Sequence, residues 1–116
     1  MRKRRDFSKI KCGWHEVGGQ RIYFRSNFEL KYARHLQFLK DMNVIKNWEH
    51  EPQVFYFEGI KRGVTNYTPD FKVTNLDDSF YYVETKGFWD SKSITKVKRF
   101  RKYFPDLKLV CVNQRS

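Results

Sequence analysis

The sequence predicts an α/β or α+β domain in which helices flank a mixed central β-sheet, preceded by a β-hairpin. Two observations predict it: one amphipathic stretch with helical spacing lies in each half of the chain, and several runs rich in aromatic and β-branched residues surround them. The 116 residues suffice for one domain with a modest core. Eleven Phe, seven Tyr and three Trp supply the apolar surface for that core and argue against disorder.

The N-terminal segment is expected to form a basic arm over residues 1–9, and residues 10–116 a single domain. The domain opens with a β-hairpin, whose strands we place at residues 11–15 and 21–24. The pair Gly18 and Gly19 lies between them and suits the tight turn, because glycine adopts positive φ angles at little cost.

A first helix is predicted over Asn27–Asp41. Ser26 suits its N-cap and Glu29 its third helical position, which together match a capping box. Glu29 also falls within the apolar arc of the helical wheel, so its carboxylate should face the sheet or its rim. The apolar residues of that arc are Phe28, Tyr32, Ala33, Leu36 and Leu39.

Further strands and a second helix follow from the remaining pattern. The predicted strands cover residues 44–49, 54–58, 67–74, 80–85 and 107–112, and the second helix covers residues 91–104, before Pro105. The short turn NLDDS joins the third and fourth of these strands, which should therefore form an antiparallel hairpin. The last strand, LKLVCV, is apolar enough to be central in the sheet.

Two carboxylates and a lysine should meet at one end of this hairpin. Side chains alternate along a strand, so Glu84 and Lys86 point to one face and Thr85 turns away. Asp70, on the neighbouring strand, can lie beside Glu84. Carboxylates within apolar strands are costly to bury unless a cation pairs with them. The alternative is an ordinary salt-bridge cluster with Lys86.

A hard divalent cation fits this group, because Mg²⁺ takes carboxylate oxygens together with waters and substrate phosphates. The backbone carbonyl of Thr85 is a further candidate ligand beside Asp70 and Glu84. Lys86 is expected to orient or deprotonate a water, or to offset charge in the transition state. Glu29 is expected to complete the metal site while it caps its helix.

The segment WEHEP offers one more ligand. Alternation places Glu49 and Glu51 on one face and His50 on the other. We favour Glu49 as a further ligand or as a ligand of a second metal, with Glu51 as the neighbouring alternative. An edge strand with solvated charges would explain both glutamates equally well.

The net charge of +11, from 24 Lys and Arg against 13 Asp and Glu, predicts a polyanionic partner such as DNA. The second helix carries many of these cations around its apolar stripe, where they would contact phosphates without reading sequence. They are Lys92, Lys96, Lys98, Arg99 and Lys102. The chain contains no apolar run long enough to span a membrane and no signal-peptide pattern, so we expect a cytoplasmic setting.

The motif pair TPDF at residues 68–71 and VETKG at residues 83–87 resembles the PD-(D/E)XK nuclease superfamily, which has a restriction-endonuclease-like fold. The wider pattern, which adds YFPDLKLVCV, resembles the Holliday-junction-resolving endonuclease I of T-odd phages and related small phage nucleases. FRSNFELKYARHLQFL is similar to the helix that carries the family's early glutamate, and NWEHEPQVFYF to the strand with its second glutamate. The resemblance covers about residues 24–112.

The resemblance implies that Asp70, Glu84 and Lys86 form the catalytic triplet, that Glu29 is the helix glutamate and that Glu49 is the second one. It also implies phosphodiester hydrolysis dependent on Mg²⁺ or Mn²⁺, by a homodimer acting on branched DNA in the host cell of a phage or in a bacterial nucleoid. Some transposon end-cutting subunits and homing endonucleases share the layout. A site-specific homing-type or restriction-like nuclease acting on linear duplex is therefore an alternative, and a catalytically silent DNA-binding module is another.

Overall fold

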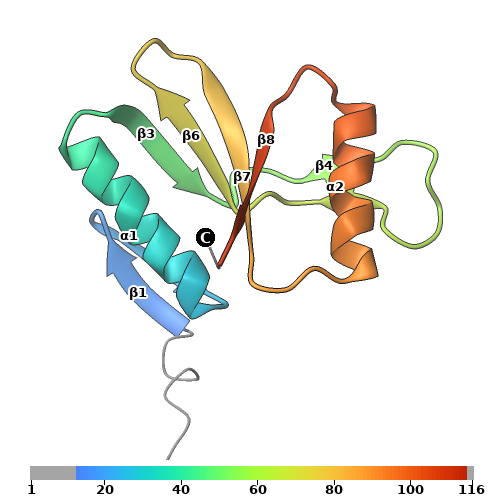
Figure 1. The fold of residues 1–116 in the computed structure, drawn as a ribbon, viewed down its shortest axis with the longest axis horizontal. Helices are drawn as coiled ribbons and strands as arrows, with labels where there is room; N and C mark the ends of the chain where they lie inside the picture. Colours follow the sequence, from blue (N-terminus) through green and yellow to red (C-terminus); the bar gives the residue numbers. More distant parts are fainter. Residues whose placement is uncertain (1–12, 115–116) are drawn as a thin grey trace, which may run out of the picture.

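The structure, a computed structural model, describes residues 13–114; the basic arm predicted at residues 1–9 lies outside them. These described residues form an α+β fold with two helices, one four-stranded sheet and two small two-stranded sheets (Figure 1). In chain order the elements are β1 (Gly13–Val17), β2 (Gln20–Phe24), α1 (Asn27–Asp41), β3 (Ile45–His50), β4 (Phe55–Tyr56), β5 (Asn66–Tyr67), β6 (Phe71–Asn75), β7 (Phe80–Lys86), α2 (Ser91–Tyr103) and β8 (Leu109–Asn113).

The four-stranded sheet has the order β3-β6-β7-β8. Strand β6 is antiparallel to both β3 and β7, whereas β8 is parallel to β7. The predicted mixed sheet and its β6–β7 hairpin are therefore confirmed. The expectation that the last strand is central is wrong: α2 provides the crossover that a parallel pair requires, and it returns the chain to an edge where residues 13–114 place no further strand.

The two helices cover opposite faces of the sheet (Figure 1). Alternation along β7 sends Val83 toward α1 and Tyr82 toward α2, so each face builds its own apolar cluster. The cluster under α1 includes Phe24, Leu30, Leu36, Trp48, Phe71 and Val83. The cluster under α2 includes Phe55, Phe57, Tyr82, Val97, Phe100 and Leu109. The hairpin β1–β2 packs beside α1 through Val17 and Phe24.

The predicted bounds of α1, Asn27–Asp41, are confirmed. Ser26 is its N-cap, and the Ser26 Oγ accepts the Glu29 N–H at 3.1 Å. In return, the Glu29 Oε1 accepts the N–H of Arg25 at 3.1 Å, one residue before the cap. These reciprocal bonds satisfy backbone donors that a helix start would otherwise leave unpaired, and they fix where the Glu29 carboxylate lies.

The predicted strand over residues 67–74 is broken in two. Tyr67 ends β5, which pairs with β4, and Phe71 begins β6 in the large sheet. Pro69, which is fully buried, lies at the break because proline has no N–H to continue a ladder of hydrogen bonds. As a consequence, Asp70 lies just outside β6, at the end of the sheet.

Candidate active site

A cavity of about 600 Å³ lies at the end of β7, between the first turns of α1 and α2. Four segments far apart in the sequence line it: the start of α1, the stretch from the β4–β5 loop to Asp70, the end of β7 with the two residues after it, and the first half of α2. Its walls bring together five residues that the sequence singled out: Glu29, Asp70, Glu84, Thr85 and Lys86.

The pairing of β6 with β7 positions the central group. Phe71 pairs with Val83. Because the two strands are antiparallel, Asp70, which precedes Phe71, comes opposite Glu84, which follows Val83. Lys86 follows on the same face, with its Nζ 3.7 Å from the Glu84 Oε2. The Glu84 side chain is only 8% exposed, whereas that of Lys86 is 28% exposed, so the ammonium reaches the open part of the cavity.

Thr85 holds the Asp70 carboxylate in place. Its backbone N–H and its Oγ1 both donate to the Asp70 Oδ2, at 2.8 and 2.7 Å. The Thr85 side chain, predicted to turn away from this group, reaches Asp70 because Asp70 precedes β6 and does not follow the alternation of that strand. Within residues 13–114 the Asp70 Oδ1 accepts no hydrogen bond, which leaves one carboxylate oxygen available to a ligand.

Tyr67 plays the same part for Glu84, and sequence reasoning missed it. Tyr67 belongs to β5 in the two-stranded β4–β5 sheet, and its hydroxyl donates to the Glu84 Oε1 at 2.6 Å. Burial and the Glu84 charge raise the pKa of Tyr67 far above its usual range, so the phenol stays a proton donor. A Tyr in a strand is common, and nothing in the local sequence marks this one.

Burial disfavours the ionised form of the two central carboxyl groups of the cavity. Burial and, after it, the charge of the nearby Asp70 raise the pKa of Glu84 to about 7, against the opposing effects of Tyr67, Lys86 and Lys96. Burial also raises the pKa of Asp70, despite the Thr85 hydrogen bonds. Both shifts mean that ionised carboxylates here are under-stabilised, which is the environment that a bound cation would relieve.

Glu29 belongs to a second group that adjoins Asp70. Its Oε2 lies 2.8 Å from the His50 Nε2, and ligand atoms of Glu29, His50 and Glu51 all lie within 4.8 Å of one another. The Glu51 N–H donates to the Asp70 carbonyl at 2.8 Å, which ties this group to the break before β6. Arg25 donates to the Glu51 Oε2 at 2.5 Å. Besides burial, the negative charge of Glu29 contributes to raising the pKa of Asp70.

The structure places Glu51, and not Glu49, beside Glu29, which lines the cavity. Glu49 is exposed on β3 and does not line the cavity. Together with burial, the larger cause, its charge raises the pKa of Tyr82 on the α2 side of the sheet. The predicted common face of Glu49 and Glu51 is wrong. Glu51 lies beyond the end of β3 and has a φ of 45°, so it leaves the extended conformation and turns its carboxylate toward His50.

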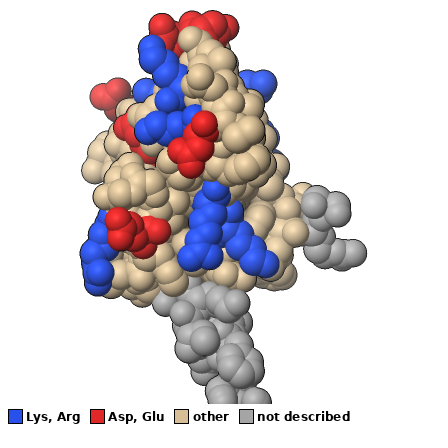
Figure 2. Space-filling view, turned by 90° about the vertical axis from the view of Figure 1, so that its left-hand side faces the viewer, with Lys and Arg blue, Asp and Glu red and all other residues tan. Residues whose placement is uncertain are grey.

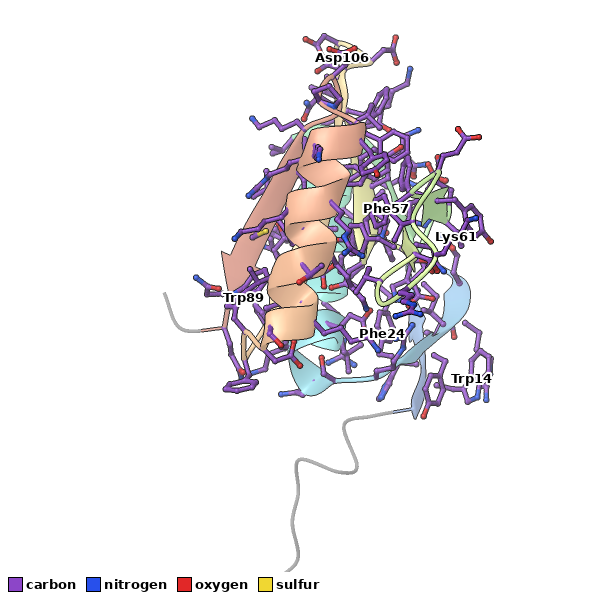
Figure 3. The ribbon with its side chains drawn as sticks, turned by 90° about the vertical axis from the view of Figure 1, so that its right-hand side faces the viewer. Trp14, Phe24, Phe57, Lys61, Trp89 and Asp106 are labelled. Atoms are coloured by element: carbon purple, nitrogen blue, oxygen red, sulfur yellow. The ribbon has the colours of Figure 1, made fainter. Side chains whose placement is uncertain are left out.

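The basic residues predicted on α2 fall into three groups. Lys92 and Lys96 line the cavity. Arg99 instead donates to the Val64 carbonyl and so joins α2 to the β4–β5 loop, which lies beside the helix in Figure 3. Lys98 and Lys102 are exposed and do not line the cavity.

The opposite side of the molecule shows no single basic patch. Figure 2 views the face that carries α1 and the hairpin, and its Lys and Arg side chains lie in separate groups beside Asp and Glu. The cations most closely associated with the carboxylates are therefore the cavity-lining ones, which are Arg25, Lys86, Lys92 and Lys96.

Comparison with known proteins places nearly the whole chain in one family. A family model described as "Protein of unknown function (DUF1064)" matches residues 9–116, which include every residue of the cavity. No curated protein matches the chain. Neither helix within residues 13–114 is long and apolar enough to cross a membrane.

Proposed function

Because the chain belongs to the DUF1064 family, whose function is unknown, we infer its activity from the cavity and propose a metal-dependent DNA endonuclease that hydrolyses phosphodiester bonds. The observation that carries this proposal is the convergence of Asp70, Glu84 and Lys86 in one cavity with Lys92 and Lys96. Acidic groups able to hold a cation, next to lysines able to hold phosphates, suit phosphoryl transfer.

Asp70 and Glu84 would hold Mg²⁺ or Mn²⁺, with the Thr85 carbonyl as a further oxygen ligand and Glu29 in support. The fit rests on the raised pKa of both carboxyl groups and on an Asp70 oxygen that has no hydrogen bond within residues 13–114. When bound, such an ion polarises a phosphoryl oxygen and lowers the pKa of a bound water. Both oxygens of Glu29 already accept or share hydrogen bonds, and its negative charge close to Asp70 would add to the attraction for a cation.

The chain's own residues supply orientation and charge. Tyr67 and Thr85 hold the two carboxylates in fixed positions, so little reorganisation is needed when substrate arrives. Lys86 lies beside Glu84 with its ammonium in the open cavity, where it orients the attacking water or offsets the negative charge that develops on the phosphate. Lys92 and Lys96 neutralise flanking phosphates.

The proposal is tested by cleavage of a four-way DNA junction, a linear duplex and a plasmid, each with Mg²⁺, with Mn²⁺ and with EDTA. We expect cleavage by the wild type only with metal, and a loss of at least 100-fold in Asp70→Asn and Lys86→Ala, since each removes a group acting on the reacting phosphate. Glu49→Gln, which alters an exposed glutamate outside the cavity, serves as the matched control. Full activity of Asp70→Asn and Lys86→Ala would refute the proposal.

The same assay separates the substrates. The resemblance favours branched DNA, so cuts should be confined to the junction; discrete cuts in unbranched duplex would indicate the restriction-like alternative. Titration of the protein with Mn²⁺, read out as bound metal, tests the silent DNA-binding module. That alternative holds if Mn²⁺ does not bind and Asp70→Asn changes the stability alone. Sedimentation velocity tests the homodimer that the resemblance implies.

A further inference from the structure

The outward face of the β1–β2 hairpin carries an aromatic pair that the proposed chemistry does not use. Trp14 and Tyr23 lie directly opposite each other, with ring centroids 5.6 Å apart and an interplanar angle of 71°. They remain 58% and 49% exposed. The inward face of the same hairpin buries Val17 and Phe24 under α1, so this outward exposure is not a requirement of the core.

One arginine and one glutamate accompany the two rings. The Arg21 guanidinium lies over the Trp14 ring, 5.4 Å from its centroid, and the register places Glu16 opposite Arg21. Alternation along β2 puts Arg21 and Tyr23 on the same face, and Arg25, two residues further on, lines the cavity. The aromatic pair is thus continuous along the chain with the cavity wall.

The position of the hairpin in the molecule agrees with this path. In Figure 3, Trp14 projects from the hairpin away from the body of the protein, and it lies toward the lower end, as Trp89 does on the other side. The first turns of α1 and α2, between which the cavity lies, are at that same end in Figure 1. A strand leaving the cavity past Arg25 would meet the two rings.

We propose that Trp14, Tyr23 and Arg21 bind unpaired nucleotides of a DNA strand whose phosphodiester lies in the cavity. The proposal rests on the proposed function for the position of that phosphodiester. Exposed aromatic rings stack on unpaired bases of any sequence, and a neighbouring arginine adds cation–π attraction and a phosphate contact. Bases within a blunt duplex are stacked on each other, so the hairpin would favour DNA with a single-stranded tail or branch.

The aromatic pair also has a purely structural explanation. Cross-strand aromatic pairs stabilise antiparallel strands, and a two-stranded sheet such as β1–β2 has few other contacts to rely on. A useful variant must therefore keep the apolar contact with Tyr23 and remove the flat ring. Trp14→Leu does this, Trp14→Phe retains a ring that can stack, and Phe38→Leu alters a similarly exposed aromatic, 57% exposed on α1.

The test measures binding in EDTA, without catalysis, to a labelled blunt duplex and to the same duplex carrying a single-stranded tail of about eight nucleotides. We expect Trp14→Leu to weaken binding of the tailed duplex about tenfold and to leave blunt-duplex binding within twofold. Trp14→Phe and Phe38→Leu should bind both DNAs within about threefold of the wild type.

Two outcomes would overturn the inference: equal losses on tailed and blunt DNA, or no loss on either, in Trp14→Leu protein that thermal denaturation shows to be folded. The binding and cleavage measurements distinguish a failure of this inference from a failure of the proposed endonuclease activity. Selective loss in Trp14→Leu from a protein that cuts no DNA with Mg²⁺ would refute the endonuclease and keep the single-strand contact. Normal cleavage and normal tailed-DNA binding by Trp14→Leu would refute the contact alone.

Discussion

Among the single residues of the cavity, Glu84 carries a carboxyl group whose pKa lies well above its usual range. It is 6% exposed, Tyr67 donates to one of its oxygens, and Lys86 lies 3.7 Å from the other. These partners do not outweigh the cost of burial and of the nearby Asp70, so its pKa rises to about 7. The ionised form of this carboxyl group therefore lowers the stability of the metal-free protein.

Glu84→Gln should stabilise the metal-free protein at pH 8. The folded state has a pKa of about 7 for Glu84 and the unfolded state about 4.5, so the folded state binds more protons between these values and loses stability as pH rises through them. The full penalty, on the order of 3 kcal/mol, is present above pH 7. Urea unfolding at pH 5 and pH 8 in EDTA measures it.

The glutamine keeps an oxygen that accepts the Tyr67 hydroxyl, so the substitution changes charge with little change in shape. Glu49→Gln, on the exposed surface of β3, is the control. If Glu84→Gln retains the wild-type fall in stability between pH 5 and pH 8, the assigned cause is incorrect.

Tyr67→Phe should destabilise the protein at pH 8, whereas Glu84→Gln should stabilise it. Loss of the hydroxyl removes the hydrogen bond that lowers the pKa of Glu84, so this pKa should rise further. We expect a destabilisation of about 1–3 kcal/mol at pH 8, because a buried carboxylate loses a partner. Urea unfolding of Tyr67→Phe, alone and combined with Glu84→Gln, checks this. Loss of the Tyr67 hydroxyl should cost less stability in the Glu84→Gln background than in the wild type, and an equal cost in both would contradict an interaction between the two side chains.

Among the secondary-structure elements, the β4–β5 loop is positioned by α2. Arg99, predicted as a DNA contact, donates to the Val64 carbonyl, and residues 63–66 of the loop form one wall of the cavity. Helix α1 is positioned at its own start by the Ser26 and Glu29 bonds. Both helices therefore fix cavity walls through polar contacts in addition to packing on the sheet, α1 at its first turn and α2 through Arg99 in its third turn.

Arg99→Met should loosen the loop while it keeps most of the apolar stem. The Val64 carbonyl loses its partner, and we expect a stability loss of about 1–2 kcal/mol and faster trypsin cleavage after Lys61 and Arg62. Limited proteolysis followed by mass spectrometry measures this rate. Lys98→Met, one residue earlier on the exposed side of α2, is the matched control; similar acceleration in both variants would exclude a specific role for Arg99.

Over the whole molecule, a net charge of +11 coexists with a cavity that gathers several carboxylates. Such a charge attracts any polyanion over long range, but only cations close to the bound phosphates release counterions on binding. Lys92 and Lys96 line the cavity, whereas Lys46 pairs with Asp78 near the far end of the sheet.

Replacement of both Lys92 and Lys96 by Gln should lower the salt dependence of DNA binding. Each lost phosphate contact reduces the slope of log K against log salt by about 0.9, so the double variant should lose nearly two units of slope. Fluorescence anisotropy from about 50 to 200 mM NaCl in EDTA measures it. The double variant Lys46→Gln and Lys108→Gln carries the same charge change away from the cavity; equal slopes for the two variants would show that only net charge matters.

The sequence by itself determined the elements and contacts that depend on neighbours in the chain. The bounds of α1 follow from a capping box and a helical period, and the proximity of Asp70 to Glu84 and Lys86 follows from the short turn between β6 and β7. These features need only local hydrogen bonds and strand alternation, which residue types reveal directly.

The tertiary structure decided what depends on packing between distant segments. Tyr67 donates to Glu84 from another sheet, and Arg99 donates to a loop carbonyl 35 residues away in the sequence. Glu51, and not Glu49, lies beside Glu29 because the φ angle of Glu51 departs from the strand conformation. The edge position of β8 likewise results from the path of the α2 crossover. A one-dimensional pattern cannot specify these, because each is set by which surfaces bury each other once the chain is folded.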